Sequence, residues 1–412
     1  MKVCITTLEF PPDVGGVGES VHRISKMLTA GGYEVHVAIF RASHRFGKNG
    51  SRRRASCTST LQDGIYVHRI QNAVRSDTVE IQDFYSDVYF YLKQLHQQHQ
   101  FDLFHTFFMT ETGYVTTMLA READIPIINS VRGSDLHKHI FSAKYHAPLS
   151  WVLENAAWNT FVSRDLQHRA EVIAPSIKSK SSAFWNSIAP VEFTDLPTPS
   201  LASELSGLVI GSVGRLRDKK GIEFLMDACE QVSSEIDLTL LLIGDFVEKE
   251  RAYWEQELQR STLGDRLKIT GIVSRAEALA YLPLLDIYAI PSLNDGCPNA
   301  LLEAMCAGCP IIGSDADAIG EILEHQSNGI VVNPGSTEDL ANAIRFLANQ
   351  PELRKTLGKA ARQTVVEKLA PEVEYQNWME VYRNAIALHA AKIAPQNGDR
   401  LINLNVQDLA LL

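Results

Sequence analysis

The chain lacks any long apolar segment. No run of about 18 apolar residues, the length that crosses a bilayer, occurs anywhere in its 412 residues. Residues 1–8 are too short and too polar for a signal peptide, and we expect them to form a buried strand. We therefore expect a cytoplasmic protein, with peripheral attachment to the inner face of the membrane left open.

Cysteine is also scarce. Six cysteines stand at positions 4, 57, 229, 297, 306 and 309, too scattered for a disulfide framework, which indicates a reducing compartment. The segment Cys306-Ala307-Gly308-Cys309 has Cys-x-x-Cys spacing, but no second Cys or His pair completes a zinc site. We expect these two cysteines to be small buried residues at a helix-to-strand turn.

An excess of basic charge is missing as well. The formal net charge is −10, which argues against a nucleic-acid partner because such binding requires a basic surface. One local exception is the segment 41–54, with Arg41, Arg45, Lys48, Arg52, Arg53 and Arg54. We favour a solvated loop. The alternative is a patch that meets a phosphorylated acceptor or an anionic membrane surface, worth about 1 kcal/mol per residue.

The sequence does contain two successive series of strand and helix patterns, and its length exceeds one ordinary core. In the first half, apolar runs predict strands at residues 3–8, 34–40, 65–70, 103–105, 126–130 and 160–163. Helical spacing predicts a helix at residues 18–30. This alternation predicts a parallel sheet covered by helices.

A stretch rich in Pro, Ser and Thr separates the halves at residues 190–206. The alternation then restarts, with helices at 222–233 and 298–307 and strands at 209–213, 238–243, 267–270, 287–290, 310–313 and 329–332. We predict domains at 1–195 and 206–370, with a cleft at the carboxyl ends of both sheets. A last helix is expected at about 371–390, and the tail 391–412 is either a strand or a docking segment.

The most informative segment is Asn294-Asp295-Gly296-Cys297-Pro298-Asn299-Ala300-Leu301-Leu302-Glu303-Ala304-Met305. Asp295 lies in the loop before a predicted helix, and Glu303 lies about two turns inside it. The first N–H groups of a helix lack partners and attract anions, whereas carboxylates accept hydrogen bonds from hydroxyls. A ligand that is part sugar and part phosphate, a nucleotide sugar, fits such a site.

This block resembles the Glu-x7-Glu signature of the retaining glycosyltransferases of family 4, with Asp295 at its first position. Two further blocks resemble the family in the right order: residues 212–221, Ser-Val-Gly-Arg-Leu-Arg-Asp-Lys-Lys-Gly, and the glycine loop 10–18. The resemblance covers residues 1 to about 390. It implies the GT-B fold, an α/β architecture of two tandem Rossmann-like doubly wound domains facing each other across a cleft. In that fold the last helix returns to the first domain, here through Trp378, Val381 and Tyr382.

The resemblance places Arg215 and Lys220 on the diphosphate of the donor, where negative charge grows as the glycosidic bond breaks. These two cations take the part of a metal ion, so we expect no metal and no cofactor. The structural alternative is surface charge at the start of a helix.

Gly15 and Gly16 allow a ligand close to the backbone because glycine has no Cβ. A dinucleotide site needs a third glycine, where this chain has Val21, and an acidic residue after the second strand, which ends in Phe40-Arg41. A dehydrogenase is therefore disfavoured. The resemblance implies that this loop helps to bind the diphosphate or the acceptor, whereas a tight turn before a helix is the structural alternative.

The two carboxylates have separable roles by resemblance: Asp295 meets the hexose and Glu303 the ribose. Asn299 and Ala300 offer backbone N–H groups to the sugar. The alternative for a helical glutamate is a solvated face.

Besides Asp295, a second position departs from the family. In Val131-Arg132-Gly133-Ser134-Asp135, many relatives carry histidine where this chain has Arg132. Arginine stays protonated and is no base, but a retaining front-face mechanism requires none. Arg132 would bind the sugar or an anionic acceptor, unless the site is degenerate. His105 and Asp135 are further candidates for lining the cleft, and for His105 a structural role is equally open.

These features predict a retaining, metal-independent glycosyltransferase that moves a hexose from a nucleoside diphosphate sugar to a hydroxyl acceptor in polysaccharide or glycolipid assembly. Two alternatives stay open: a non-catalytic regulator that binds nucleotide sugars, and a nucleotide-sugar epimerase. Donor base, hexose, acceptor and linkage are not determined by the sequence.

Overall fold

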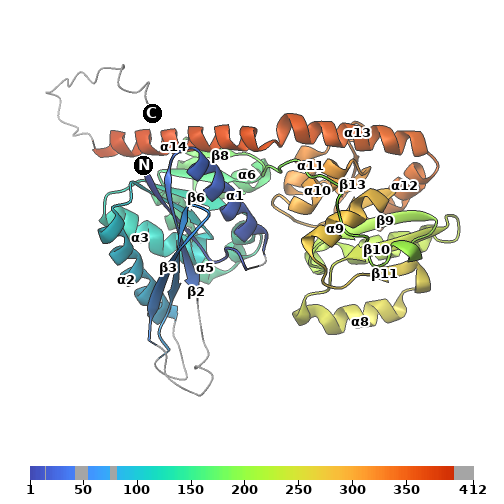
Figure 1. The fold of residues 1–412 in the computed structure, drawn as a ribbon, viewed down its shortest axis with the longest axis horizontal. Coiled ribbons are helices and arrows are strands. Elements are labelled where there is room, and N and C mark those ends of the chain that lie inside the picture. Colours follow the sequence, from blue (N-terminus) through green and yellow to red (C-terminus); the bar gives the residue numbers. More distant parts are fainter. Residues whose placement is uncertain (14, 42–53, 75–80, 394–412) are drawn as a thin grey trace.

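The computed structural model describes residues 1–13, 15–41, 54–74 and 81–393. It contains two α/β lobes side by side, and two helices in sequence extend over both of them (Figure 1). Among the helices in the described ranges, none is long and apolar enough to cross a membrane. The segment 401–406 and most of the basic segment 41–54 lie outside the described residues.

The first lobe is built on an eight-stranded sheet in the order β3-β4-β2-β1-β5-β6-β7-β8. The strands are β1 Lys2–Thr7, β2 Glu34–Arg41, β3 Ser56–Gln62, β4 Ile65–Gln71, β5 Leu103–Phe107, β6 Ile127–Val131, β7 Trp158–Phe161 and β8 Ser181–Ala183. All neighbours run parallel except β3, which pairs antiparallel with β4 at the edge. The central strands are buried on both faces because helices cover both sides of the sheet.

Those helices divide between the two faces of the sheet. The first face packs against α1 Gly16–Ala30, and the other against α2 Ile81–His99 and α3 Tyr114–Glu122. Three further α-helices follow later in the lobe: α4 Ser134–His137, α5 Ala143–Asn155 and α6 Arg164–Ile173.

The second lobe has a six-stranded, fully parallel sheet in the order β11-β10-β9-β12-β13-β14. Its strands are β9 Leu208–Val213, β10 Leu238–Ile243, β11 Leu267–Ile269, β12 Ile287–Ile290, β13 Ile311–Ser314 and β14 Ile330–Val332. Its helices are α7 Ile222–Val232, α8 Arg251–Arg260, α9 Arg275–Tyr281, α10 Asn299–Ala307, α11 Asp317–Ile322, α12 Thr337–Ala348 and α13 Pro351–Lys368. One core lies under α7, α8 and α12, and a second lies under α9, α10, α11 and α13.

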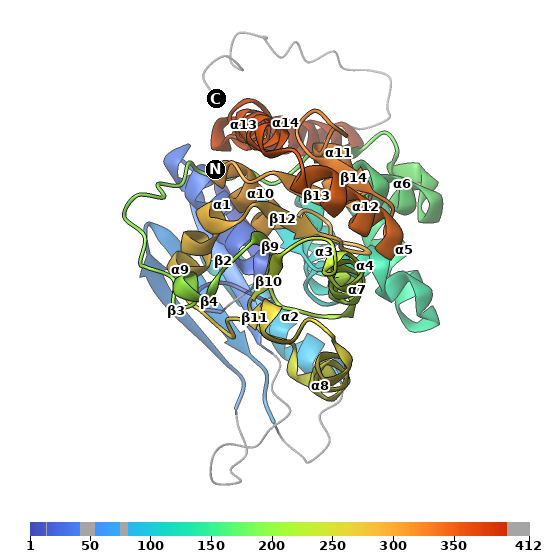
Figure 2. The same cartoon turned by 90° about the vertical axis from the view of Figure 1, so that its right-hand side faces the viewer.

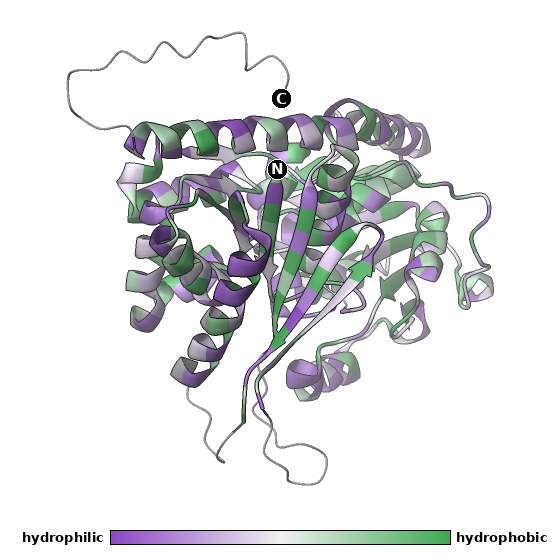
Figure 3. Cartoon of the chain, turned by 60° about the vertical axis from the view of Figure 1, so that its left-hand side comes forward, coloured by the Kyte–Doolittle hydropathy of each residue, from purple (hydrophilic) through white to green (hydrophobic). Residues whose placement is uncertain are grey.

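The last helix, α14 Pro371–Ile393, leaves the second lobe and packs on the first. Trp378, Val381 and Tyr382 are almost completely buried in the same core as α1. Seen from the end, α13 and α14 lie above both sheets (Figure 2). Hydrophilic and hydrophobic residues alternate around the helix nearest the C-terminus (Figure 3), as expected for a helix with one buried face.

The two parallel sheets confirm the predicted fold class. The predicted strands are present with ends within about two residues. Two strands were not predicted. The sequence of β3, Ser-Cys-Thr-Ser-Thr-Leu-Gln, is mostly exposed and has no apolar alternation, and β8 is only three small residues, Ser-Ser-Ala.

Candidate active site

The candidate site begins where the loop after β9 packs on the loop after β12. Gly221 ends the first loop with a φ of 65°, and a Cβ there would lie 2.1 Å from the carbonyl oxygen of Pro291. The Leu293 N–H also donates to the Lys219 carbonyl at 2.8 Å. Only glycine permits this close approach, which brings the 215–220 loop beside Asp295.

Lys220 and Asp295 form a direct ion pair, and their side chains are only 19% and 15% exposed. Lys219 lies on the other carboxylate oxygen, with Nζ 3.8 Å from Oδ1. Burial raises the pKa of Asp295, but the two lysines outweigh it and hold the pKa below its usual value. The sequence assigned Lys220 and Asp295 to different parts of the donor, whereas the structure pairs them with each other.

The backbone of Asp295 is hydrogen-bonded to Asp317, a residue that the sequence analysis missed. Its backbone N–H donates to Asp317 Oδ2 at 2.8 Å, and the other oxygen of Asp317 accepts a hydrogen bond from His137 Nε2 at 3.0 Å. The side chains of His137 and Asp317 are 6% and 2% exposed. His137 belongs to α4 of the first lobe, so this bridge crosses the joint between the lobes. Neither His137 nor Asp317 belongs to a sequence motif. In the structure Asp317 has a φ of 46°, which is unusual for a residue other than glycine.

We expect Asp317→Ala to lower the free energy of unfolding by about 2–6 kcal/mol, because it leaves the buried His137 Nε2 and the Asp295 backbone N–H without their acceptor, at about 1–3 kcal/mol each. Chemical denaturation measures this change. Glu352→Ala is the matched control, since the Glu352–Lys355 pair is exposed and contributes at most about 1 kcal/mol. Equal losses in both variants would contradict a stabilising bridge.

The same pair predicts a pH dependence. Burial raises the pKa of Asp317, but the hydrogen bond from His137 more than offsets it, so the pKa is lowered. A lowered carboxyl pKa stabilises the fold above the unfolded value, about 3.9, and this contribution is lost as the pH falls through the folded pKa. The advantage of the wild type over Asp317→Ala should therefore persist in mildly acidic buffer and shrink below about pH 4.

Glu303 is largely buried on α10 and has one cationic partner. Arg275, at the start of α9, donates from Nε at 3.0 Å and from Nη2 at 2.8 Å to the same oxygen, Oε1. The Glu303 side chain is 14% exposed and that of Arg275 is 65% exposed. Burial raises the pKa of Glu303, although Arg275 opposes the shift. Sequence spacing did not identify Arg275, because it lies outside all three motif blocks.

The glycine loop contacts Glu9, another residue that the sequence analysis missed. A Cβ on Gly15 would lie 2.0 Å from Glu9 Oε2, whereas Gly16 faces open space. Burial raises the pKa of Glu9, and the Gly18 N–H and the charge of Arg215 oppose it. The exposed Arg215 of the second lobe is therefore electrostatically coupled to the glycine loop of the first.

Arg132 is half-buried at the interface between the lobes, with its Nε and Nη2 atoms shielded from solvent. Its guanidinium lies 5.0 Å from the Phe107 ring centre and 5.9 Å from that of Trp378, and Nη1 donates to Asn186 Oδ1 at 2.8 Å. Burial lowers the pKa of Arg132 to about 10. Within the described residues, its Nε and Nη2 have no hydrogen-bond partner.

Arg132 is connected to the start of α10 through Asn186 and through its own backbone. Asn186 Nδ2 donates to the Cys297 carbonyl at 3.1 Å. A Cβ on Gly296 would lie 2.4 Å from the Arg132 carbonyl oxygen, so the two lobes touch here.

His105 and Asp135 do not line a cleft, contrary to the expectation for them. His105 is 0% exposed and its ring nitrogens lie 2.9 Å from the Tyr382 hydroxyl and 2.7 Å from Ser130 Oγ. Asp135 is 3% exposed, and burial raises its pKa to about 6. The backbone N–H groups of residues 109 and 110 donate to its carboxylate and partly oppose this rise. His105 lies within β5 and faces α14, so packing of the last helix buries it.

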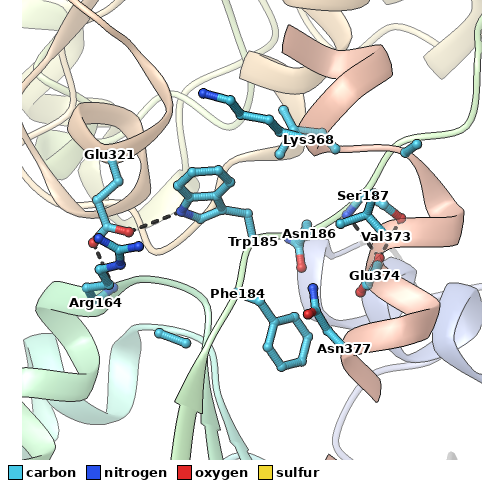
Figure 4. Close-up of a pocket in the computed structure, with 13 residues that line it drawn as sticks. Arg164, Phe184, Trp185, Asn186, Ser187, Glu321, Lys368, Val373, Glu374 and Asn377 are labelled. Atoms are coloured by element: carbon cyan, nitrogen blue, oxygen red, sulfur yellow. Dashed lines mark hydrogen bonds between the residues drawn. The ribbon is translucent and has the colours of Figure 1, made fainter. Parts of the chain in front are cut away.

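A cavity of about 220 Å³ lies elsewhere in the joint (Figure 4). It is lined by residues after β8 and by α11, α13 and α14, among them Trp185, Glu321 and Lys368. Trp185 Nε1 donates to Glu321 Oε2 at 3.0 Å across it. None of the predicted site residues lines this cavity, so it is not the predicted donor site.

Two parallel α/β lobes and a last helix that returns to the first lobe define the GT-B class of fold. Solved structures agree. Sucrose-phosphate synthase from Thermosynechococcus elongatus has a TM-score of 0.74 at 20% identity, covering 94% of this chain and 99% of that one. Anabaena HepE in complex with UDP has a TM-score of 0.73 at 19% identity, covering 93% and 100%.

The family follows from the sequence comparisons. The model described as Glycosyltransferase Family 4 matches residues 14–181, and that described as Glycosyl transferases group 1 matches residues 199–364. The chain belongs to the family 4 type of glycosyltransferases, which confirms the resemblance drawn from its motifs.

Individual relatives are distant. N-acetyl-alpha-D-glucosaminyl L-malate synthase of Bacillus anthracis is 22% identical over 94% of this chain and 97% of its own length. The chain spans about half the length of other curated relatives. It matches 43% of 2-deoxystreptamine N-acetyl-D-glucosaminyltransferase of Niallia circulans (25% identity, 41% of this chain). It matches 54% of the lipopolysaccharide core biosynthesis glycosyltransferase LpsD of Rhizobium meliloti (29% identity, 48% of this chain).

Proposed function

We propose that the protein is a retaining, metal-independent glycosyltransferase that moves a hexose from a nucleoside diphosphate sugar to a hydroxyl acceptor in polysaccharide or glycolipid assembly. The observation that carries this proposal is the buried Lys220–Asp295 pair in front of α10, beside Lys219. Clustered cations stabilise a leaving diphosphate, and a carboxylate at the same place binds sugar hydroxyls.

The start of α10 supports the phosphate or sugar side of this site. Pro298 occupies the N-cap position and makes no side-chain cap, so the first N–H groups of the helix, at Asn299 and Ala300, are available to a ligand. Glu303 lies only about one turn inside α10, which begins at Asn299, and would accept hydrogen bonds from the ribose hydroxyls. A ligand there would have to share Glu303 with Arg275 or displace it.

In the proposed reaction, the bond from the anomeric carbon to the β-phosphate oxygen breaks and a bond to the acceptor oxygen forms on the same face. The acceptor proton passes to the leaving phosphate oxygen, so no protein base is needed. Lys220 exchanges the Asp295 carboxylate for the diphosphate, and this frees Asp295 to bind the hexose. Arg132 would hold the start of α10 in place through Asn186, as a positioning residue.

A uridine nucleotide is the first donor to test, because the similar HepE structures contain UDP and UDP-glucose. A panel of UDP-, GDP- and ADP-sugars should include one that raises the unfolding midpoint, since a ligand that binds only the folded state stabilises it. The same sugar should be released slowly to water. Stabilisation without release would favour a regulator, and an epimerised donor would favour an epimerase. No stabilisation by any donor would contradict the proposal.

A further inference from the structure

Three histidines from separate elements of the first lobe converge on one point. His36 lies on β2, His68 on β4, and His99 is the last residue of α2. One ring nitrogen from each lies within 4.8 Å of the others, the only such group of potential metal ligands found in the described parts of the chain. They are far apart in sequence, so no sequence motif predicts that they meet.

The hydrogen bonds around two of these rings suit metal ligands. His36 Nδ1 and His68 Nε2 face each other at 2.9 Å, so one proton at most lies between them. Their outer nitrogens are occupied: His36 Nε2 lies 3.0 Å from Glu34 Oε1, and His68 Nδ1 lies 2.7 Å from Ser59 Oγ. A metal-binding histidine characteristically donates its other N–H to a carboxylate or another oxygen, which orients the ring.

The surroundings favour neutral imidazoles and exclude water from two of them. His36 is 0% exposed and His68 is 1% exposed, and the Tyr66 ring stacks on His36 at 4.7 Å. The 2.9 Å contact between His36 Nδ1 and His68 Nε2 has room for one proton at most, so at least one of the two facing nitrogens carries a free lone pair. A ring nitrogen without a proton is the form that binds a metal.

His99 leaves one side of the cluster accessible. It is half-buried at the carboxyl end of α2, where the helix dipole favours a cation. Lys2 Nζ donates to its carbonyl at 3.1 Å, which fixes the backbone but not the ring. Because His99 is half-exposed, solvent reaches this side of the cluster and can supply a water ligand.

We propose that His36, His68 and His99 bind one Zn²⁺ ion, with water as the fourth ligand. Imidazole nitrogens are typical zinc ligands at about 2.0–2.1 Å, which places them roughly 3.4 Å apart in a tetrahedron. The ion replaces the proton between His36 and His68, whose nitrogens separate by about 0.5 Å from their 2.9 Å contact. Bound zinc would join β2, β4 and α2.

This site is separate from the proposed reaction. His36 is the third residue of β2, whereas the glycine loop and Arg132 follow the carboxyl ends of their strands. The zinc ion is therefore a structural element of the first lobe and supplies nothing to sugar transfer.

The test is a zinc titration of the full chain, tag-free and dialysed against EDTA and then chelator-free buffer, in competition with a chromophoric chelator. We expect one Zn²⁺ per chain and a rise in the unfolding midpoint on adding zinc. In His68→Gln and His99→Gln the affinity should fall at least tenfold and the rise should disappear. His96→Gln is the matched control, since His96 lies one turn before His99 on α2 and outside the cluster.

Each outcome decides the proposal. Absence of competition by the wild type would show that the cluster is a hydrogen-bonded chain from Glu34 to Ser59 without metal, and would overturn the inference. Zinc bound equally by all four proteins would place it elsewhere and would also overturn it. If His68→Gln fails to fold, His99→Gln carries the test, because a half-buried residue at a helix end tolerates substitution.

Discussion

Lys220→Ala is expected to lower kcat by about a hundredfold or more. Loss of one charged contact to the leaving group in a shielded site costs roughly 2–4 kcal/mol of transition-state stabilisation. The Lys220 side chain is only 19% exposed, so water replaces it poorly. Steady-state release of the nucleoside diphosphate, with the donor identified by the stability screen, measures the effect.

Lys219→Ala is the matched control for Lys220→Ala. Lys219 carries the same charge one residue away, but its Nζ lies 3.8 Å from Asp295 and its side chain is 34% exposed. We expect it to lose less than about tenfold in kcat, since a more exposed charge is screened by solvent. Arg215→Ala should also lower kcat because the motif places Arg215 on the diphosphate, but its exposed side chain predicts a smaller loss than that of Lys220→Ala. Near-normal turnover in both Lys220→Ala and Arg215→Ala would remove these residues from the diphosphate site.

Glu303→Ala is expected to lower the affinity for the nucleotide, whereas Asp295→Ala is expected to lower kcat. Glu303→Ala should weaken binding of the bare nucleoside diphosphate by about tenfold to a hundredfold, because hydrogen bonds to a charged group contribute roughly 1.5–3 kcal/mol. Asp295→Ala should spare the bare nucleotide and lower kcat, because contacts to the hexose that tighten in the transition state appear in turnover. Calorimetry with the nucleotide, beside steady-state kinetics, separates the two.

The Arg275–Glu303 ion pair supplies a control for the Glu303→Ala variant. Arg275 donates two hydrogen bonds to Glu303, so Arg275→Ala is a control that removes the partner and keeps the carboxylate. If Glu303 acts directly on the nucleotide, Arg275→Ala should retain most of the affinity. Asp295→Glu restores the commoner family residue and should keep appreciable activity. Equal loss of nucleotide affinity in Asp295→Ala and Glu303→Ala would show that the two carboxylates do not bind separate parts of the donor, the hexose and the ribose.

The sequence by itself determined the class of fold and the order of its parts. Apolar runs of strand length alternate with helical spacing in both halves, and such local patterns depend only on which faces of an element must be buried. The block from Asp295 to Glu303 also placed one carboxylate before α10 and one inside it, because a helix start is a local event.

The tertiary structure alone decided which charges meet. Lys220 and Asp295 are 75 residues apart, His137 and Asp317 are 180 apart, and Glu303 and Arg275 are 28 apart. His105 was expected to line the cleft, yet the packing of Tyr382 from α14 buries it, and Trp378 of the same helix lies beside the guanidinium of the half-buried Arg132. The order of strands in the two sheets and the return of the last helix set these contacts. The spacing of residues along the chain does not predict these contacts, because electrostatic and packing interactions depend on the distance between residues in the folded structure.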